Sequence, residues 1–167
     1  GLPVLEGFEL TYSVRTSNPD KDISGVARLR FTATGAVAVT ATSFRYYFTL
    51  DVVPPMVVTI NRAWTERENG SEIAEIQSEH VSGTVVEYGP VIGANRYAEM
   101  TVDAPDTTLY PGHAVAVSFS VHQESWSGVL VQSDDYSYDD TKLDGQQYPW
   151  ETITVHRDGR LLGIPPT

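Results

Sequence analysis

The stretch Phe44-Arg45-Tyr46-Tyr47-Phe48-Thr49-Leu50 decides the class of fold. Large apolar side chains take every second position in it, and arginine, tyrosine and threonine take the positions between. Successive side chains of a β-strand point to opposite faces of the sheet, so a period of two predicts a strand with one buried face. We therefore expect a protein built on strands.

The same alternation recurs on both sides of this stretch. It continues in Phe8–Val14, Ala27–Ala33 and Val115–Val121, and shorter strand-like runs lie near Met56–Asn61, Gly83–Tyr88, Tyr97–Val102 and Glu151–His156. Turn residues separate these runs, and Asp158-Gly159 predicts a two-residue hairpin between Val155 and Leu161. The segment Trp64–Ile76 lacks an apolar stripe of period 3.6 and is interrupted by Asn69-Gly70, so it is predicted to be a loop.

Short strands separated by turns, with almost no helical pattern, indicate an all-β fold. We expect an antiparallel β-sandwich, and within that class a jelly roll, formed by a single domain over residues 1–167. No apolar run approaches the roughly 18 residues needed to span a bilayer, so no membrane contact is expected.

Charge and composition narrow the classes of function. The 167 residues include 11 lysines and arginines against 22 aspartates and glutamates, which gives a formal net charge of −11. Binding of nucleic acid draws on clustered positive charge, so this balance argues against nucleic acid as a partner. The chain has no cysteine, which excludes cysteine-ligated metals and thiol catalysis. Calcium and neutral polymers remain compatible with this composition.

One acidic pair stands out as a candidate metal site. Asp134 and Asp135 are adjacent, and neighbouring carboxylates repel each other unless a cation neutralises them. Thr49 and Asp51 share one face at the end of a predicted strand, where their oxygens can meet those of another segment. Calcium takes six to eight oxygen ligands of these kinds. The alternative is a solvated acidic loop, and the residues alone leave both interpretations open.

Catalytic motifs are absent from the sequence. The four histidines lack metal-ligand spacing, and there is no nucleophile elbow, phosphate loop or dinucleotide fingerprint. Paired carboxylates of a glycoside hydrolase stay open, because the sequence does not give their separation. We expect that the protein is not an enzyme.

Aromatic residues offer a different chemistry. Sugar rings present C–H faces that pack on aromatic rings. Trp126 lies in a polar segment, Gln123–Gly128, where a large ring has no periodic reason to be, and Trp64 has similar surroundings. Each tryptophan is a candidate for sugar stacking, and core packing is the alternative for each.

The order and spacing of several motifs resemble the family 3 carbohydrate-binding modules of cellulases and cellulosomal scaffoldins. The motifs are Ser17-Asn18-Pro19, Phe44–Asp51, Leu109-Tyr110-Pro111-Gly112, Trp126-Ser127, Ser133–Tyr138, Trp150-Glu151 and Asp158-Gly159. The resemblance implies a nine-stranded jelly roll with a structural calcium. Carried over by position, the calcium ligands are Thr49, Asp51, Asp134 and Asp135, with the backbone carbonyl of Val131.

Two binding surfaces follow from the same resemblance. Members that bind crystalline cellulose use a flat strip with an Asp–His pair, a Tyr, an Arg and a Trp. Trp126 matches the Trp, Ser120 stands at the position of the Arg, and Trp64 or Arg62 can substitute in kind for the others. The family's shallow groove on the opposite sheet is matched by Asn18, Arg45, Tyr47, Glu99 and Tyr136.

The resulting hypothesis is a non-catalytic carbohydrate-binding module that attaches a larger secreted or cell-surface protein to cellulose or a related β-glucan. The alternative is a family 3-like module that has lost crystalline cellulose binding and acts as a structural or linker-binding domain through the groove. We expect an extracellular monomer, with linker peptide or neighbouring domains of the parent protein as further partners.

Overall fold

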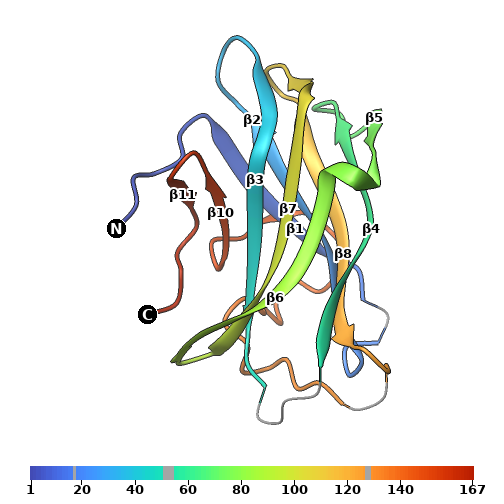
Figure 1. Cartoon of the computed structure of the whole chain (residues 1–167), viewed down its shortest axis with the longest axis vertical. Helices are drawn as coiled ribbons and strands as arrows, with labels where there is room; N and C mark the ends of the chain where they lie inside the picture. Colours follow the sequence, from blue (N-terminus) through green and yellow to red (C-terminus); the bar gives the residue numbers. More distant parts are fainter. Residues whose placement is uncertain (17, 51–54, 127–128) are drawn as a thin grey trace.

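A computed structural model describes residues 1–167 except 17, 51–54 and 127–128. The described chain forms two antiparallel sheets that pack face to face (Figure 1). Its elements are β1 (Phe8–Val14), β2 (Asp22–Phe31), β3 (Val37–Phe48), β4 (Met56–Glu66), β5 (Glu72–Ile76), the 3₁₀ turn η1 (Ser78–His80), β6 (Val81–Val91), β7 (Ala94–Leu109), β8 (Ala114–Gln123), β9 (Tyr148–Pro149), β10 (Ile153–Arg157) and β11 (Arg160–Leu162). Within the described residues no helix is long and apolar enough to cross a membrane.

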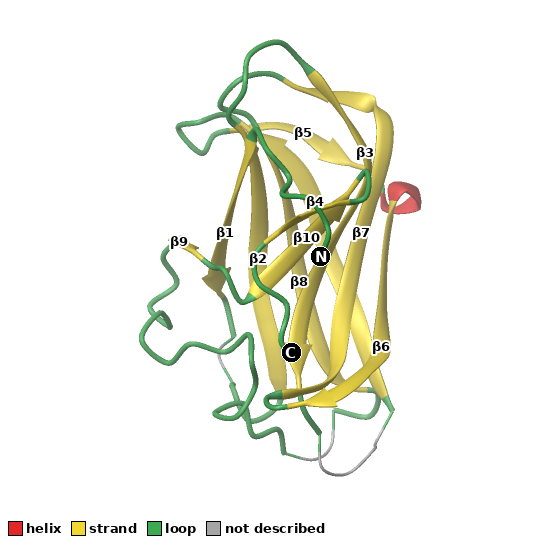
Figure 2. Ribbon diagram, turned by 90° about the vertical axis from the view of Figure 1, so that its left-hand side faces the viewer, coloured by secondary structure: helices red, strands yellow, loops and turns green. Residues whose placement is uncertain are grey.

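The two sheets have six and five strands. The six-stranded sheet has the order β5-β4-β8-β2-β1-β9, and the five-stranded sheet has the order β11-β10-β3-β7-β6. Figure 2 shows the sheets as two layers, with the long connection between β8 and β9 packed beside them. The prediction of an all-β antiparallel sandwich is confirmed.

The core lies between the sheets, where the predicted alternation places it. Phe44, Tyr46 and Phe48 of β3 are buried, and β8 buries Val115, Val117, Phe119 and Val121 opposite them. The ring of Tyr12 connects the layers, because its centroid lies 5.9 Å from that of Tyr46 on β3, and it also lies 4.9 Å from Trp150. Burial of these large side chains holds the two sheets together.

Two features of the strands differ from the prediction. The segment Trp64–Ile76, predicted as a loop, contains the end of β4 and all of β5, joined by the turn at Asn69-Gly70. Four of the five residues of β5 are exposed, so this edge strand carries no apolar alternation to read. The described residues contain eleven strands rather than nine. The number is nine when β9 and β11, which are only two and three residues long, are left out.

The predicted hairpin at Asp158-Gly159 is confirmed. Arg157 pairs with Arg160, so the turn has two residues, and both have positive φ angles, 50° and 70°. This is the backbone of a type I′ turn, in which glycine meets the requirement for a left-handed conformation without strain.

Candidate functional site

The outer face of the six-stranded sheet carries the first group of predicted residues. On β8 the outward positions are Ala116, Ser118, Ser120 and His122, since the residues between them face the core. The register of β4 places Thr59 opposite Ser120 and Arg62 opposite Ser118. We call the surface formed by Trp126, His122, Ser120, Ser118, Thr59 and Asn61 the outer strip.

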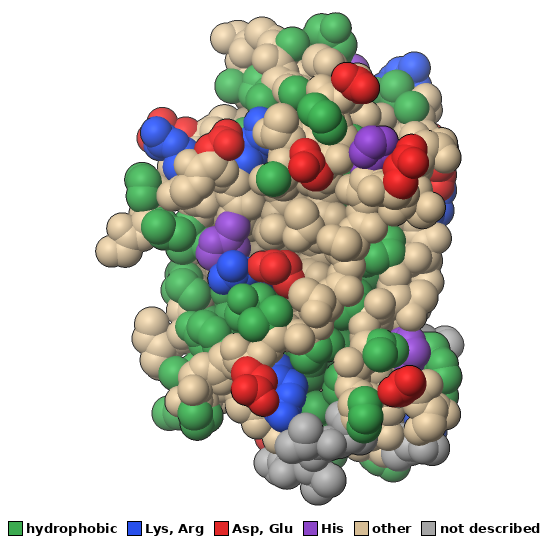
Figure 3. Space-filling model, in the orientation of Figure 1, with side chains coloured by type: hydrophobic (Ala, Val, Ile, Leu, Met, Phe, Trp, Pro, Cys, Tyr) green, Lys and Arg blue, Asp and Glu red, His purple; other side chains and the backbone are tan. Residues whose placement is uncertain are grey.

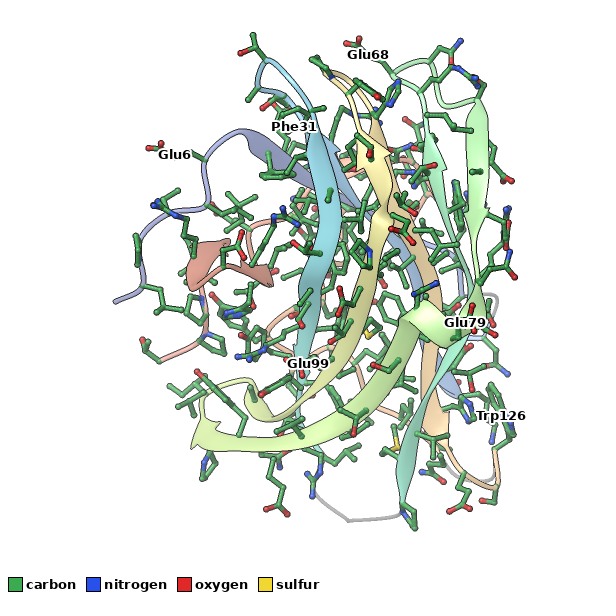
Figure 4. The ribbon with its side chains drawn as sticks, turned by 45° about the horizontal axis from the view of Figure 1, so that its top comes forward. Glu6, Phe31, Glu68, Glu79, Glu99 and Trp126 are labelled. Atoms are coloured by element: carbon green, nitrogen blue, oxygen red, sulfur yellow. The ribbon has the colours of Figure 1, made fainter. Side chains whose placement is uncertain are left out.

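Trp126 is the exposed aromatic residue of the outer strip. Half of its surface is accessible, and its indole ring lies parallel to the imidazole of His122, with ring centroids 3.5 Å apart and planes 9° apart. Figure 4 shows Trp126 at the border of the molecule, well away from Glu99 on the other sheet. One face of the indole is therefore backed by protein.

His122 is fixed in turn by two hydrogen bonds. Its Nδ1 lies 2.8 Å from the carbonyl oxygen of Gln123, and its Nε2 lies 2.9 Å from Oγ1 of Thr59. A carbonyl only accepts, so Nδ1 carries a hydrogen and donates it to Gln123, while Nε2 is hydrogen-bonded to the threonine hydroxyl. The sequence assigned His122 no role beyond its lack of metal-ligand spacing, because its stacking partner Trp126 lies beyond the end of its strand.

Trp64 does not offer an open ring, which corrects one of the two expectations for it. It is only 9% exposed, and its indole nitrogen donates a 3.1 Å hydrogen bond to Glu66. The guanidinium of Arg62 lies 4.4 Å above the ring and is ion-paired with Glu72 and Glu75. Arg62 is itself exposed, so it covers Trp64 and presents a flat polar group in its place.

A buried ion pair supports this end of the sheet. Glu66 accepts from Arg28 at 2.8 Å and lies 3.6 Å from Arg30. Burial lowers the pKa of Arg28, and its ion pair with Glu66 opposes that effect. Because Glu66 also accepts the hydrogen bond from Trp64, the ion pair and the indole ring form one connected cluster. This cluster lies at the end of the sheet opposite to Trp126.

Hydroxyl and amide groups occupy the outer strip between Trp126 and Arg62. Ser120 Oγ donates to Ser24 Oγ at 3.2 Å, and Asn61 Nδ2 donates to Ser118 Oγ at 3.4 Å. From Ala116, opposite Trp64, to Gln123 the strand advances about 24 Å at roughly 3.4 Å per residue. The strip is thus an extended neutral surface that ends in a half-exposed indole.

The predicted metal residues fall on the connection after β8, at the end of β3. Tyr47 N donates to Ser137 Oγ at 2.7 Å and Ser137 N donates to the carbonyl of Tyr47 at 3.1 Å, so this connection is bonded to β3. As a result Asp135 Oδ1 accepts a 3.0 Å hydrogen bond from the amide of Thr49. The structure brings Thr49 and Asp135 together as expected, whereas Asp51 lies outside the described residues.

The carboxyl of Asp135 is buried in a way that suits a cation. The residue is 6% exposed, and none of the ion pairs found among the described residues includes it. Its pKa is raised to about 8, mainly by burial and also by neighbouring Asp134, while the hydrogen bond from the amide of Thr49 opposes the rise. A buried carboxylate beside a second one is unfavourable without a positive charge. Oxygen donors of this kind fit calcium.

The opposite face, on the five-stranded sheet, carries four of the five predicted groove residues. Arg45 Nε donates to Glu99 Oε2 at 2.8 Å, and its guanidinium lies 4.5 Å from the ring of Tyr97. Tyr47 is the centre of a cluster, with ring centroids 5.3 Å from Tyr88, 5.6 Å from Tyr97 and 6.0 Å from Tyr136. Hydrophobic side chains gather over this part of the molecule in Figure 3.

This tyrosine cluster is not an open groove, because the C-terminal segment lies on it. The hydroxyls of Tyr88 and Tyr136 donate to the carbonyls of Pro166 and Ile164 at 2.6 and 2.7 Å. Tyr47 is only 1% exposed, and Pro166 is buried. Sequence reasoning assigned Tyr47 and Tyr136 to this face, and it missed both Tyr88 and the C-terminal segment that lies on the cluster.

Asn18 does not belong to this cluster, contrary to expectation. It lies in the turn between β1 and β2 of the other sheet, where its carbonyl accepts from the amides of Lys21 and Asp22. Its described hydrogen bonds are all local to that turn. The resemblance assigned Asn18 to the groove, but the fold places it in the turn between β1 and β2.

Comparison with known proteins decides the family. Residues 9–163 match the cellulose binding domain family. The chain belongs to this family. The cellulose-binding domain is also 26% identical over 152 residues, 90% of the chain, to the cellulosomal-scaffolding proteins A and B of Acetivibrio thermocellus. It spans only 19% of the length of protein B and 8% of that of protein A.

Solved structures show the same fold. A family 3a scaffoldin domain with flanking linkers from Clostridium thermocellum superimposes with a TM-score of 0.83 at 24% identity, covering 99% of this chain and 95% of that one. A family IIIa domain from Clostridium cellulolyticum gives 0.82 at 20% identity, covering 98% and 99%. The cellulose-binding domain is therefore a non-catalytic module with the sandwich that the resemblance implied.

Proposed function

We propose that this cellulose-binding domain holds cellulose, or a related β-glucan, along the outer strip and so attaches a larger secreted or cell-surface protein to it. The observation that carries the proposal is the indole of Trp126, half exposed and fixed in plane by His122. An oriented ring can receive the C–H face of a pyranose without first being ordered.

The rest of the outer strip suits a neutral polymer. Ser120 is only 8% exposed and is bonded to Ser24, so the accessible hydroxyl and amide groups are those of Ser118, Thr59 and Asn61, at the outward positions of two adjacent strands. These groups can exchange hydrogen bonds with sugar hydroxyls, and they carry no charge that would have to be desolvated. Arg62 extends the strip with a planar donor. Membership of the family favours this function over a purely structural module.

A depletion assay on microcrystalline and amorphous cellulose tests the proposal. We expect Trp126→Ala to weaken binding by about tenfold or more, because the indole is the exposed aromatic ring of the outer strip. Tyr110→Ala is the matched control, since Tyr110 is 55% exposed and precedes β8, whereas Trp126 follows the other end of that strand. Full recovery of the unmutated protein in the supernatant at low and high salt would refute cellulose binding.

A structural calcium completes the proposal for the connection after β8. Its ligands would be Thr49, Asp51, Asp134, Asp135 and the backbone carbonyl of Val131. Support comes from the buried carboxyl of Asp135, which has no cationic partner among the described ion pairs. When bound, the ion would neutralise this carboxyl and join the connection to the end of β3.

The tyrosine cluster supports a second function, the seating of a peptide that continues from the domain. The favouring observation is the pair of hydrogen bonds from Tyr88 and Tyr136 to carbonyls of the C-terminal segment. Backbone carbonyls and prolines are features of a linker peptide rather than of a sugar. We propose that the domain acts as an extracellular monomer, one module over residues 1–167, whose tyrosine cluster orders a linker to its neighbours.

Hydrogen exchange at Ile164 measures this seating, because the Ile164 amide donates to Glu151 only while the segment is docked. The double variant Tyr88→Phe/Tyr136→Phe should exchange this amide about tenfold faster, since it loses both hydroxyl donors. Tyr110→Phe is the control for the same chemical change. Equal exchange in all three proteins would remove the peptide-seating function.

A further inference from the structure

A cavity of about 130 Å³ opens at the side of the sandwich, and its lining includes neither Trp126 nor Tyr47, although one lining residue, Ser24, is hydrogen-bonded to Ser120 of the outer strip. It lies between the ends of β1 and β2 and the connection from Leu130 to Trp150. Its inner walls are Tyr12, Ile23, Tyr46, Gln132, Tyr138 and Trp150, and we call it the side pocket. An engineered apolar cavity of about 150 Å³ in another protein admits benzene, so this volume suits one six-membered ring.

Two phenol hydroxyls reach the side pocket without a protein partner. Tyr12 and Tyr46 are 1% and 2% exposed, yet neither hydroxyl makes a hydrogen bond among those of the described residues. No polar atom of the described residues is both sealed from solvent and unpaired, so these hydroxyls must contact the open space of the pocket. Burial raises the pKa of both phenols, so both stay protonated and able to donate.

The chain makes room for one of these hydroxyls at a specific residue. A Cβ atom on Gly25 would lie 2.1 Å from Oη of Tyr12, so any other residue there would displace the ring. Gly25 sits in the middle of β2, where glycine weakens a strand. The position of the Tyr12 hydroxyl therefore depends on this glycine.

The walls of the side pocket define the chemistry of a ligand. All its lining side chains are neutral, which disfavours an ion. Gln132 donates its amide hydrogens to the carbonyls of Pro19 and Asp22, at 2.7 and 2.9 Å, which leaves its oxygen as an acceptor. Tyr138 and Trp150 add aromatic surface. Aromatic walls with two free donors and an acceptor match a small ring that carries several hydroxyls.

We propose that the side pocket binds a single neutral pyranose, such as the terminal sugar of a glycan, independently of the outer strip. A ring with hydroxyls on adjacent carbons can satisfy both phenols at once, whereas a phenol-like ligand offers only one hydroxyl. A ligand with so few atoms binds weakly, so we expect a dissociation constant in the millimolar range.

Nuclear magnetic resonance of ¹⁵N-labelled protein tests the proposal with D-glucose and cellobiose as probes. The three tryptophans give three indole N–H signals, and Trp150 reports on the side pocket while Trp126 reports on the outer strip. We expect D-glucose to shift the Trp150 signal in a saturable manner. Absence of a saturable shift at Trp150 would overturn the proposal, and a shift confined to Trp126 would do the same, because it places the sugar on the outer strip.

Variants separate sugar binding from folding. Tyr12→Phe/Tyr46→Phe keeps both rings and removes only the hydroxyls, so it should weaken glucose binding at least tenfold while the melting temperature without sugar stays unchanged. Tyr110→Phe makes the same change on the exposed surface and should leave binding intact. Leu143→Trp, at the mouth of the side pocket, should block entry without touching the inner walls. Undiminished binding in the double variant would refute the assignment.

Discussion

Trp126 holds a backbone conformation that few residues other than glycine adopt, with φ at 57°. A left-handed conformation costs a non-glycine residue about 1 kcal/mol. The parallel contact with His122 offsets part of this cost and turns the indole outward. The orientation of the ring therefore depends on a second residue four positions before it.

His122 should accordingly matter for cellulose binding although it is only 4% exposed. We expect His122→Ala to reduce affinity for cellulose about three- to tenfold, because the indole loses its backing and must be ordered on binding. Depletion isotherms measure the effect. His113→Ala is the matched control, since His113 contacts Tyr110 directly before β8 begins, whereas His122 and Trp126 lie at the other end of that strand. An unchanged isotherm for His122→Ala would show that Trp126 needs no such support.

Trp64 shows why sequence did not decide the role of each tryptophan. Both tryptophans have polar neighbours in the chain, yet Trp64 is buried and Trp126 is exposed. The groups that cover Trp64 come from β2 and β5 as well as from its own strand, through Arg28 and the carboxylates that hold Arg62. These contacts between distant segments are set by strand register, which the composition of one segment does not contain.

At the scale of single elements, β10 makes the stability of the domain sensitive to acid. His156 lies beside Thr154, with Nε2 3.1 Å from its hydroxyl. Burial and, to a smaller extent, the neighbouring guanidinium of Arg45 together lower the pKa of His156 to about 4, against the opposing effect of Glu99. The folded protein therefore stays neutral at this site where the unfolded chain takes up a proton.

The sign of the pH effect follows from this difference. Between about pH 6.5 and pH 4, His156 binds a proton in the unfolded chain but not in the folded domain. The free energy of unfolding therefore falls as the pH falls through this window. His156 keeps contact with solvent, so we expect a loss of only about 1–2 kcal/mol. Urea unfolding at pH 7 and pH 4.5 measures it. His156→Gln should reduce the difference between the two pH values, and an equal difference in the variant would contradict the assignment.

Most elements could be predicted because burial on one face imposes a period of two, as in β1 and β3. The strand β5 was missed because four of its five residues are exposed. For the metal residues the resemblance predicted that Thr49 and Asp135 would meet, and they do. The same transfer failed for Asn18, because a turn residue has no periodic pattern that fixes its sheet. The docking of the C-terminal segment left no signal in its own sequence.

At the scale of the whole molecule, the proposed calcium should set the melting temperature. The connection after β8 is bonded to β3 through Ser137, so a cation there stabilises the contact between two parts of the fold. At about 100-fold excess over its dissociation constant, a ligand of the folded state adds roughly 2.7 kcal/mol. We expect exhaustive chelation to lower the melting temperature by about 5–10 °C.

Calorimetry with calcium and with a chelator measures this change. Asp135→Asn should melt at the same temperature in both solutions, because the variant loses a ligand and no longer buries a charge. Asp106→Asn, an exposed site on β7, should respond to chelation as the unmutated protein does. A melting temperature of the unmutated domain that is insensitive to chelation would exclude the metal.

The central strand β8 has a further consequence for how such domains diverge. Its residues Ala114 to Val117 are 0–1% exposed, so its register is locked from both sides. Trp126, by contrast, lies in the segment that follows the end of β8. Lengthening or shortening that segment would change the distance between the indole and the fixed serines of β8. Evolution can thus adapt the domain to polysaccharides whose sugar rings repeat at different distances, without changing the core.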